Sequence, residues 1–218
     1  MNPQAKYPKL KTLFNEIEKI QKEILIIGKK ILEMFNKEIY LLHFLLLSSL
    51  NRTLNITDGI LEATNKWNFI VSAALLRMQI ETLASLVYVS KSHIGKQSEF
   101  YFKEGRLKKM EVVGNQVRWV NIRERELINF ANMFFPWMTK VYEETCRIVH
   151  FSNKNIYSMT RSFNNETRNF EWAIAVGNEN WSEGDIKELL EVLINTEKEI
   201  LNYSKLIAED FKKSLSQK

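Results

Sequence analysis

Apolar residues recur every three or four positions along most of this chain, and this spacing predicts helices. Between residues 9 and 35 the apolar side chains fall on one helical face, while Lys and Glu fill the other. A second helix is predicted from about residue 36 to residue 64, apolar in its first half and polar in its second. The last helix is predicted to begin at Ser182, a favourable N-cap residue, and to run to about Lys213.

The segment from Phe69 to about Ser92 is apolar on almost every side, which predicts a central helix with neighbours all round it. It is long enough to cross a membrane. However, Arg77, Gln79 and Glu81 lie near its middle, where charges in a bilayer are costly. We therefore predict a helix surrounded by other helices, and no membrane association.

The remaining segments predict short helices and one region of a different kind. Short helices are predicted at residues 97–115, 122–130 and 136–150. Residues 151–181 lack a helical period, and Asn164-Asn165 separates two β-tolerant runs, so either a small hairpin or an irregular loop is predicted there. The predicted fold is all-α: a multi-helix bundle in a single domain over residues 1–218, with one irregular or β-hairpin insertion at about 151–181.

The amino-acid composition is typical of long helices and excludes several kinds of functional site. Seven glycines and three prolines in 218 residues leave few turn-forming positions. The net charge is +5, but Lys alternates with Glu along the helices, which is more typical of a solvated surface than of a nucleic-acid patch. A single cysteine, Cys146, excludes an intrachain disulfide and a zinc site built from cysteines.

The chain has only three histidines, and it has no phosphate-binding loop and no dinucleotide motif. We therefore predict that it binds neither a metal nor a cofactor. The N-terminal segment has no uninterrupted apolar stretch of the signal-peptide type. Together with the single cysteine, this predicts a cytoplasmic protein.

Arg77 and Glu81 form the first candidate group. They are four residues apart and therefore share one face of the predicted central helix. Each must find partners, because burying an unpaired charge is very costly. Two interpretations are open: an ion pair that fixes the register of the helices, or a pocket in the bundle core where these charges bind a ligand or support catalysis.

Arg52, Asp58 and Glu62 form a second polar group on the preceding helix. The short connection at 65–68 makes the two helices antiparallel neighbours. Asp58 and Arg77 lie at similar distances from that connection, which predicts a contact between them; the alternative is a polar face exposed to solvent. Arg52 and Asp58 are therefore candidate binding residues beside Arg77.

Arg147 and His150 form the third group, in the stretch TCRIVHFS at a predicted helix end. Histidine titrates near neutral pH and suits proton transfer, whereas a guanidinium suits phosphate recognition. The two together can cleave RNA without a metal, with histidine moving the proton and arginine stabilising the charge on the phosphate. The alternative is that His150 caps or packs at the helix end while Arg147 faces solvent.

Two stretches, LLRMQIETL at residues 75–83 and RIVHFS at residues 147–152, resemble a family of bacterial all-helical proteins that is similar in outline to HEPN domains. The resemblance covers about residues 38–155. HEPN domains are common in abortive-infection and toxin–antitoxin systems. HEPN ribonucleases generally dimerise and bring together a motif with Arg and His from each subunit.

The resemblance implies a homodimer with a role in defence or stress, RNA as a partner, and an antitoxin or another protein as a second partner. It also implies Arg147 and His150 as the catalytic residues. Two residues separate them here, fewer than in the family motif, and Ile148 follows Arg147 where the motif has a polar residue.

Two functional hypotheses follow from these patterns. The first is a HEPN-like protein of a bacterial defence or stress system that acts on RNA as a metal-independent endoribonuclease. The second is a non-catalytic helical binding or interaction protein. In that case Arg77, Glu81, Asp58 and His150 would only organise the bundle.

Overall fold

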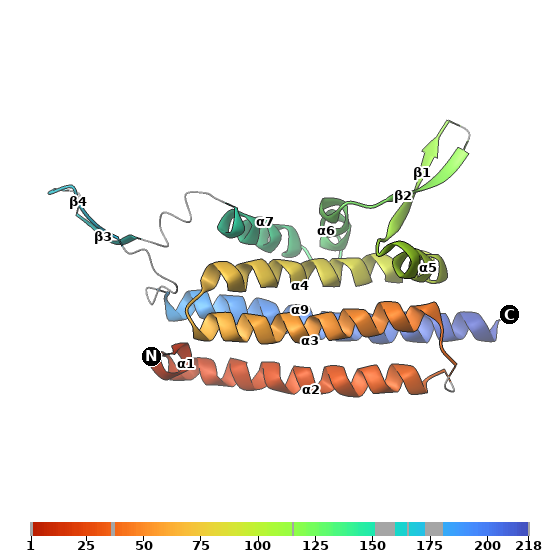
Figure 1. Cartoon of the computed structure of the whole chain (residues 1–218), viewed down its shortest axis with the longest axis horizontal. Helices are drawn as coiled ribbons and strands as arrows, with labels where there is room; N and C mark the ends of the chain where they lie inside the picture. The colour runs from red at the N-terminus through yellow and green to blue at the C-terminus, as the bar shows by residue number, and fades with distance from the viewer. Residues whose placement is uncertain are drawn as a thin grey trace.

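The computed structural model describes residues 2–35, 38–114, 116–150, 160–164, 166–172 and 181–217. It confirms an all-α bundle with a hairpin insertion. Long helices lie side by side along the molecule (Figure 1): α2 (Lys11–Glu33), α3 (Leu41–Asn65), α4 (Phe69–Ser90) and α9 (Glu183–Ser216). Short elements precede or cover them: α1 (Pro3–Lys6), η1 (Pro8–Leu10), α5 (Ile94–Glu104), α6 (Glu124–Asn132) and α7 (Met138–Val149).

The long helices lie where the periodicity predicts them, except that α3 begins at Leu41, after the predicted start near residue 36, with Tyr40 as its N-cap residue. On α2 the buried residues are Phe14, Ile17, Ile20, Ile24, Ile27 and Ile31, spaced by three and four. At the start of α9 the Ser182 hydroxyl accepts a hydrogen bond from the Asp185 N–H, and the Asp185 carboxylate accepts one from the Ser182 N–H. This reciprocal pair satisfies N–H groups that the first turn leaves unpaired, so the helix begins where expected.

Helix α4 is central, as its apolar pattern predicts. It contacts α3 and α9 on one side and α6 and α7 on the other (Figure 1). Among the described residues, α4 is the helix whose length and apolarity would suffice to cross a membrane, and 56% of its apolar window is buried inside the molecule. Its burial on several sides explains why almost no polar face is present.

The predicted helix at 97–115 is wrong in its second half. Helix α5 ends at Glu104, and Gly105 follows in the left-handed conformation with φ of 66°. Strands β1 (Lys108–Val113) and β2 (Gln116–Asn121) then form an antiparallel hairpin that projects from the bundle (Figure 1). Val113 precedes Gly114, which has a φ of 61°, and Val112 pairs with Val117 across the two strands. A glycine in this conformation between β-branched residues favours a hairpin over the helical spacing.

The insertion expected at 151–181 contains a hairpin in its described part. Strand β3 (Thr160–Asn164) pairs antiparallel with β4 (Asn169–Trp172), with Phe163 opposite Phe170. This confirms the hairpin alternative for those residues. The rest of the predicted insertion, 151–159, 165 and 173–180, lies outside the described residues.

Candidate functional site

Arg77 lies on the face of α4 that packs against α6 and α7, and its guanidinium contacts groups from both helices. Its Nε donates to Glu81 at 3.1 Å, and its Nη2 donates to the Tyr142 hydroxyl at 2.9 Å. The same Nη2 lies 3.5 Å from a carboxylate oxygen of Glu124. Because only 22% of the Arg77 side chain and 20% of the Glu81 side chain are exposed, the two charges meet partners as expected for an apolar helix.

The electrostatics of this group depend on Arg77. Burial raises the pKa of the Glu81 carboxyl above its usual value, and the nearby charge of Glu124 raises it further. Arg77 and Arg52 act in the opposite direction. Burial is also the main reason why the pKa of Tyr142 is raised. Arg77 is thus the cation that allows two carboxylates to approach each other where α4, α6 and α7 meet.

The contact predicted between Arg77 and Asp58 is absent. Asp58 is exposed on α3 and forms no ion pair within the part of the chain that the structure describes. Helices α3 and α4 are antiparallel neighbours, as predicted, but similar height along two helices does not place two side chains on facing sides. Arg52 does reach α4, where its Nε donates to the Thr82 hydroxyl at 3.1 Å.

Arg147 and His150 lie at the end of α7, and both are exposed. His150 is the C-cap residue, and its backbone N–H donates to the Cys146 carbonyl at 2.9 Å. Arg147 forms an ion pair with Glu144 at 2.8 Å. The structure therefore places both side chains on the surface at one helix end, which agrees with the geometry of either interpretation.

These two residues share a helix face with Glu143. Residues 143, 147 and 150 follow at spacings of four and three, which places them on one side of α7. The Glu143 carboxylate accepts a hydrogen bond from Arg125 of α6 at 2.5 Å. The face that carries Arg147 and His150 is therefore continuous with the start of α6.

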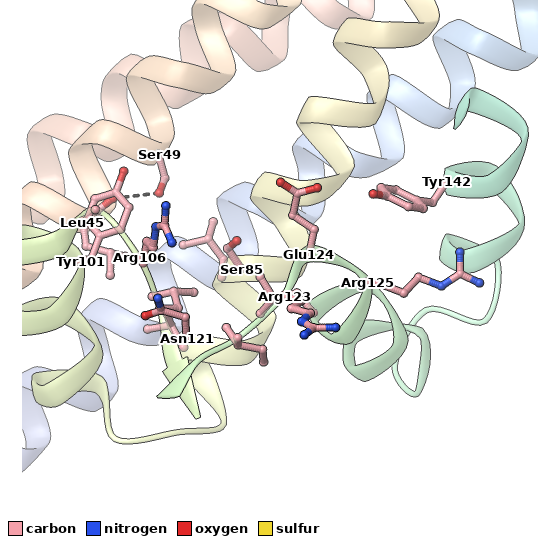
Figure 2. Close-up of a pocket in the computed structure, with 16 residues that line it drawn as sticks. Leu45, Ser49, Ser85, Tyr101, Arg106, Asn121, Arg123, Glu124, Arg125 and Tyr142 are labelled. Carbon is pink, nitrogen blue, oxygen red and sulfur yellow. Dashed lines mark hydrogen bonds between the residues drawn. The ribbon is translucent and has the colours of Figure 1, made fainter. Parts of the chain in front are cut away.

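A pocket of about 870 Å³ opens between α3, α4, α5 and the segment that joins β2 to α6 (Figure 2). Its lining includes buried leucines, two serine hydroxyls, two tyrosines, an asparagine and charged residues that follow α5 or lie at the start of α6. At one end of the pocket Figure 2 shows Arg106 near Ser49, and at the other end Glu124 near Tyr142. Because Glu124 and Tyr142 also contact Arg77, the pocket adjoins the Arg77 group.

The pocket carries more positive than negative charge. Arg106, Arg123 and Arg125 line it together with the single carboxylate of Glu124. Arg125 is paired with Glu143, whereas neither Arg106 nor Arg123 forms an ion pair with any residue that the structure describes. The charge of Arg123 acts on the nearby Glu126 carboxylate, which leaves Arg106 as the less compensated of the two. The excess of guanidinium groups in the lining favours an anionic ligand.

The sequence patterns did not identify Arg106 and Arg123 as site residues. The helix predicted at 97–115 places Arg106 on a helix surface, whereas the β1–β2 hairpin returns the chain and brings Arg123 to the same pocket. Two features of the sequence indicate the hairpin. Gly105 is a residue that favours the end of a helix, and Gly114-Asn115 is a turn-forming pair between residues that favour strands.

Within the described ranges, no three side chains of His, Cys, Asp or Glu gather in a way that could hold a metal ion. No family model matches the sequence, and no curated protein or solved structure is similar enough to count as a match. The function is therefore inferred from the geometry of these residues.

Proposed function

We propose that this chain is a HEPN-like, RNA-directed protein of a bacterial defence or stress system, and that it cleaves RNA without a metal through Arg147 and His150. The observation that carries the proposal is the shared, exposed face of α7. Arg147 and His150 lie on the side that carries Glu143, which binds Arg125 at the edge of the arginine-lined pocket. A cytoplasmic location and an antitoxin-like partner belong to the same proposal.

The chemistry follows from the two side chains. The His150 imidazole removes the proton from a ribose 2′-hydroxyl, whose oxygen attacks the adjacent phosphorus while the bond to the next 5′-oxygen breaks. The products are a cyclic 2′,3′-phosphate and a free 5′-hydroxyl. Arg147 stabilises the negative charge that accumulates on the phosphate oxygens. The leaving oxygen needs a proton, and in a homodimer the second copy supplies another histidine for this purpose.

The ion pair between Arg147 and Glu144 does not prevent phosphate binding. The pair is exposed, with 60% and 41% of the two side chains accessible. Exposed ion pairs contribute only about 0–1 kcal/mol, so a bidentate phosphate contact can replace the carboxylate.

Replacing His150 by Ala tests the proposal. RNA cleavage should fall at least about 100-fold, because general acid–base catalysis contributes about that much or more. Cleavage is measured with a short RNA that carries a fluorophore and a quencher, in the presence of EDTA to remove contaminating metal-dependent nucleases.

His93→Ala is the matched control, since His93 is an exposed histidine at the start of α5, outside the α7 face. The control should cleave like the wild type. Equal cleavage by His150→Ala and the wild type, or no cleavage by the wild-type dimer, would exclude the ribonuclease assignment.

A second candidate function is a non-catalytic helical binding protein. It is favoured by the position of His150, an exposed C-cap residue of α7 whose backbone N–H bonds to Cys146, and by the largely buried Arg77–Glu81 pair, which links α4 to its neighbours. This protein would bind RNA or another partner and release it intact. Binding of uncleaved RNA at low salt would distinguish this function from the first.

A further inference from the structure

We propose that the pocket between α3, α4, α5 and the β2–α6 segment binds a nucleoside phosphate. This inference goes beyond the ribonuclease proposal, because the pocket is a separate site from Arg147 and His150 and would bind its ligand whether or not RNA is cleaved. It depends on the size of the pocket, on its polar groups and on its unmatched charges.

The size and floor of the pocket suit a small organic ligand. Its volume of about 870 Å³ falls within the range of small-molecule sites, about 300–1,000 Å³. Leu45, Leu86 and Leu107 lie behind its wall and are almost fully covered, at 3%, 1% and 7% exposed. Tyr101 adds a half-buried aromatic side chain. A planar, partly apolar group such as a nucleobase can pack on such a surface.

Polar groups in the wall can recognise the edge of a base. The Asn121 side chain offers an amide donor and a carbonyl acceptor, and it forms no hydrogen bond with any described residue. The Ser49 and Ser85 hydroxyls donate to the carbonyls of Leu45 and Glu81 at 2.8 and 2.9 Å. Their oxygens therefore remain available as acceptors.

The charges in the pocket select for a phosphate. Arg106 and Arg123 form no side-chain ion pair with a described residue, although the charge of Arg123 acts on the nearby Glu126 carboxylate. A guanidinium binds phosphate oxygens through parallel N–H groups. A neutral nucleoside would leave both charges unmatched.

A free nucleotide and one nucleotide of an RNA strand present the same chemistry to this pocket. The pocket reaches Tyr142 on α7, and Arg147 lies five residues further along the same helix, about 8 Å at 1.5 Å per residue. Five residues also turn the helix by about 140°, so Arg147 faces a different side of α7 from Tyr142. A strand with one nucleotide in the pocket reaches Arg147 over the Arg125–Glu143 contact, because Glu143 shares a helix face with Arg147. The experiment below distinguishes the two sources.

Isothermal titration calorimetry at low salt tests the inference on the wild-type protein. The ligands are the four ribonucleoside monophosphates, the corresponding nucleosides and inorganic phosphate. At least one monophosphate should bind at least ten times more tightly than its nucleoside and than inorganic phosphate. Equal affinity for inorganic phosphate and for every nucleotide, or no nucleotide binding, would overturn the proposal.

The variant Arg106→Gln/Arg123→Gln should weaken binding of the preferred nucleotide at least tenfold. Both side chains are exposed, so the variant should melt like the wild type. Arg118→Gln is the matched control, because Arg118 is an exposed arginine on β2 outside the pocket, and it should bind normally. Unchanged binding by the double variant would refute the assigned site.

Two further experiments separate this pocket from the proposed ribonuclease site and show whether its ligand is a free nucleotide or part of an RNA strand. His150→Ala should bind the nucleotide normally even if it no longer cleaves RNA, so the two proposals can fail independently. A five-nucleotide RNA that displaces the bound nucleotide assigns the pocket to the RNA strand. An RNA that leaves the nucleotide bound assigns it to a free nucleotide. Either result supports a nucleoside phosphate as the ligand.

Discussion

The free energy of unfolding should fall steadily between about pH 5 and pH 8, and Glu197 should account for most of this fall. Glu197 is fully buried on α9, where one carboxyl oxygen accepts a hydrogen bond from the Thr57 hydroxyl and the other, Oε2, has no partner. Burial raises the pKa of Glu197 from 4.5 to about 8, with the Thr57 hydrogen bond opposing the shift. The folded protein therefore holds this carboxyl protonated at neutral pH.

The sign of the effect follows from where the proton is held. Above pH 4.5 the unfolded chain releases this proton, whereas the folded chain keeps it up to about pH 8. Stability contributed by the raised pKa is thus fully present below pH 4.5 and is lost as the pH rises to 8, by up to about 1.4 kcal/mol per pH unit.

Glu197→Gln should remove this slope, because glutamine resembles the protonated carboxyl and does not titrate. At pH 8 the variant should be more stable than the wild type by a few kcal/mol, and at pH 4.5 the two should be similar. Urea denaturation at a series of pH values measures both. Glu188→Gln, at an exposed position of the same helix, is the control and should keep the wild-type slope. Parallel curves for Glu197→Gln and the wild type would show that Glu197 titrates normally.

Arg77→Ala should lower the melting temperature by several degrees. The substitution removes the cation shared by Glu81 and Glu124 and the donor to the Tyr142 hydroxyl. Removing one partner of a buried pair costs about 3–5 kcal/mol, and because about one fifth of each side chain is exposed here we expect about 2 kcal/mol. For a chain of this length that corresponds to several degrees.

Arg77→Met/Glu81→Met should recover much of the lost stability, because replacing both members of the pair leaves no buried unmatched charge. The Glu124 carboxylate that remains is 65% exposed and is solvated by water. Arg118→Ala, an exposed arginine on β2, should melt like the wild type and serves as the control. Differential scanning calorimetry measures all four proteins. An unchanged melting temperature in Arg77→Ala would place Arg77 in an open ligand pocket rather than in a structural ion pair.

The sequence predicts the helices whose apolar spacing is regular, and it predicts one local ion pair. The positions of α2 and α9 follow from apolar steps of three and four, and the position of α4 follows from its length and its apolar residues on almost every side. The pairing of Arg77 with Glu81 follows from one helical turn. Contacts between distant segments do not follow from spacing. Glu124 and Tyr142 reach Arg77 from 47 and 65 residues away, and no local pattern marks them as its partners.

The errors have a common physical origin. The contact between Arg77 and Asp58 was predicted from height along two helices, but the direction of each side chain depends on the rotation of its helix. The prediction of a helix at 97–115 rested on apolar spacing alone. The valines on both sides of Gly114-Asn115 favour a hairpin there instead. That hairpin returns the chain, so Arg106 and Arg123 share a pocket that the sequence alone does not indicate.

The central claim is that RNA binds along the surface formed by the start of α6 and the end of α7. Photocrosslinking of a short RNA that contains 4-thiouridine, followed by mass spectrometry of the peptides, tests it most directly. We predict crosslinks within residues 121–127 and 142–150, which carry Arg123 and Arg125 of the pocket and the Arg147–His150 pair. Crosslinks confined to α2, or to the tip of the β1–β2 hairpin, would contradict the claim.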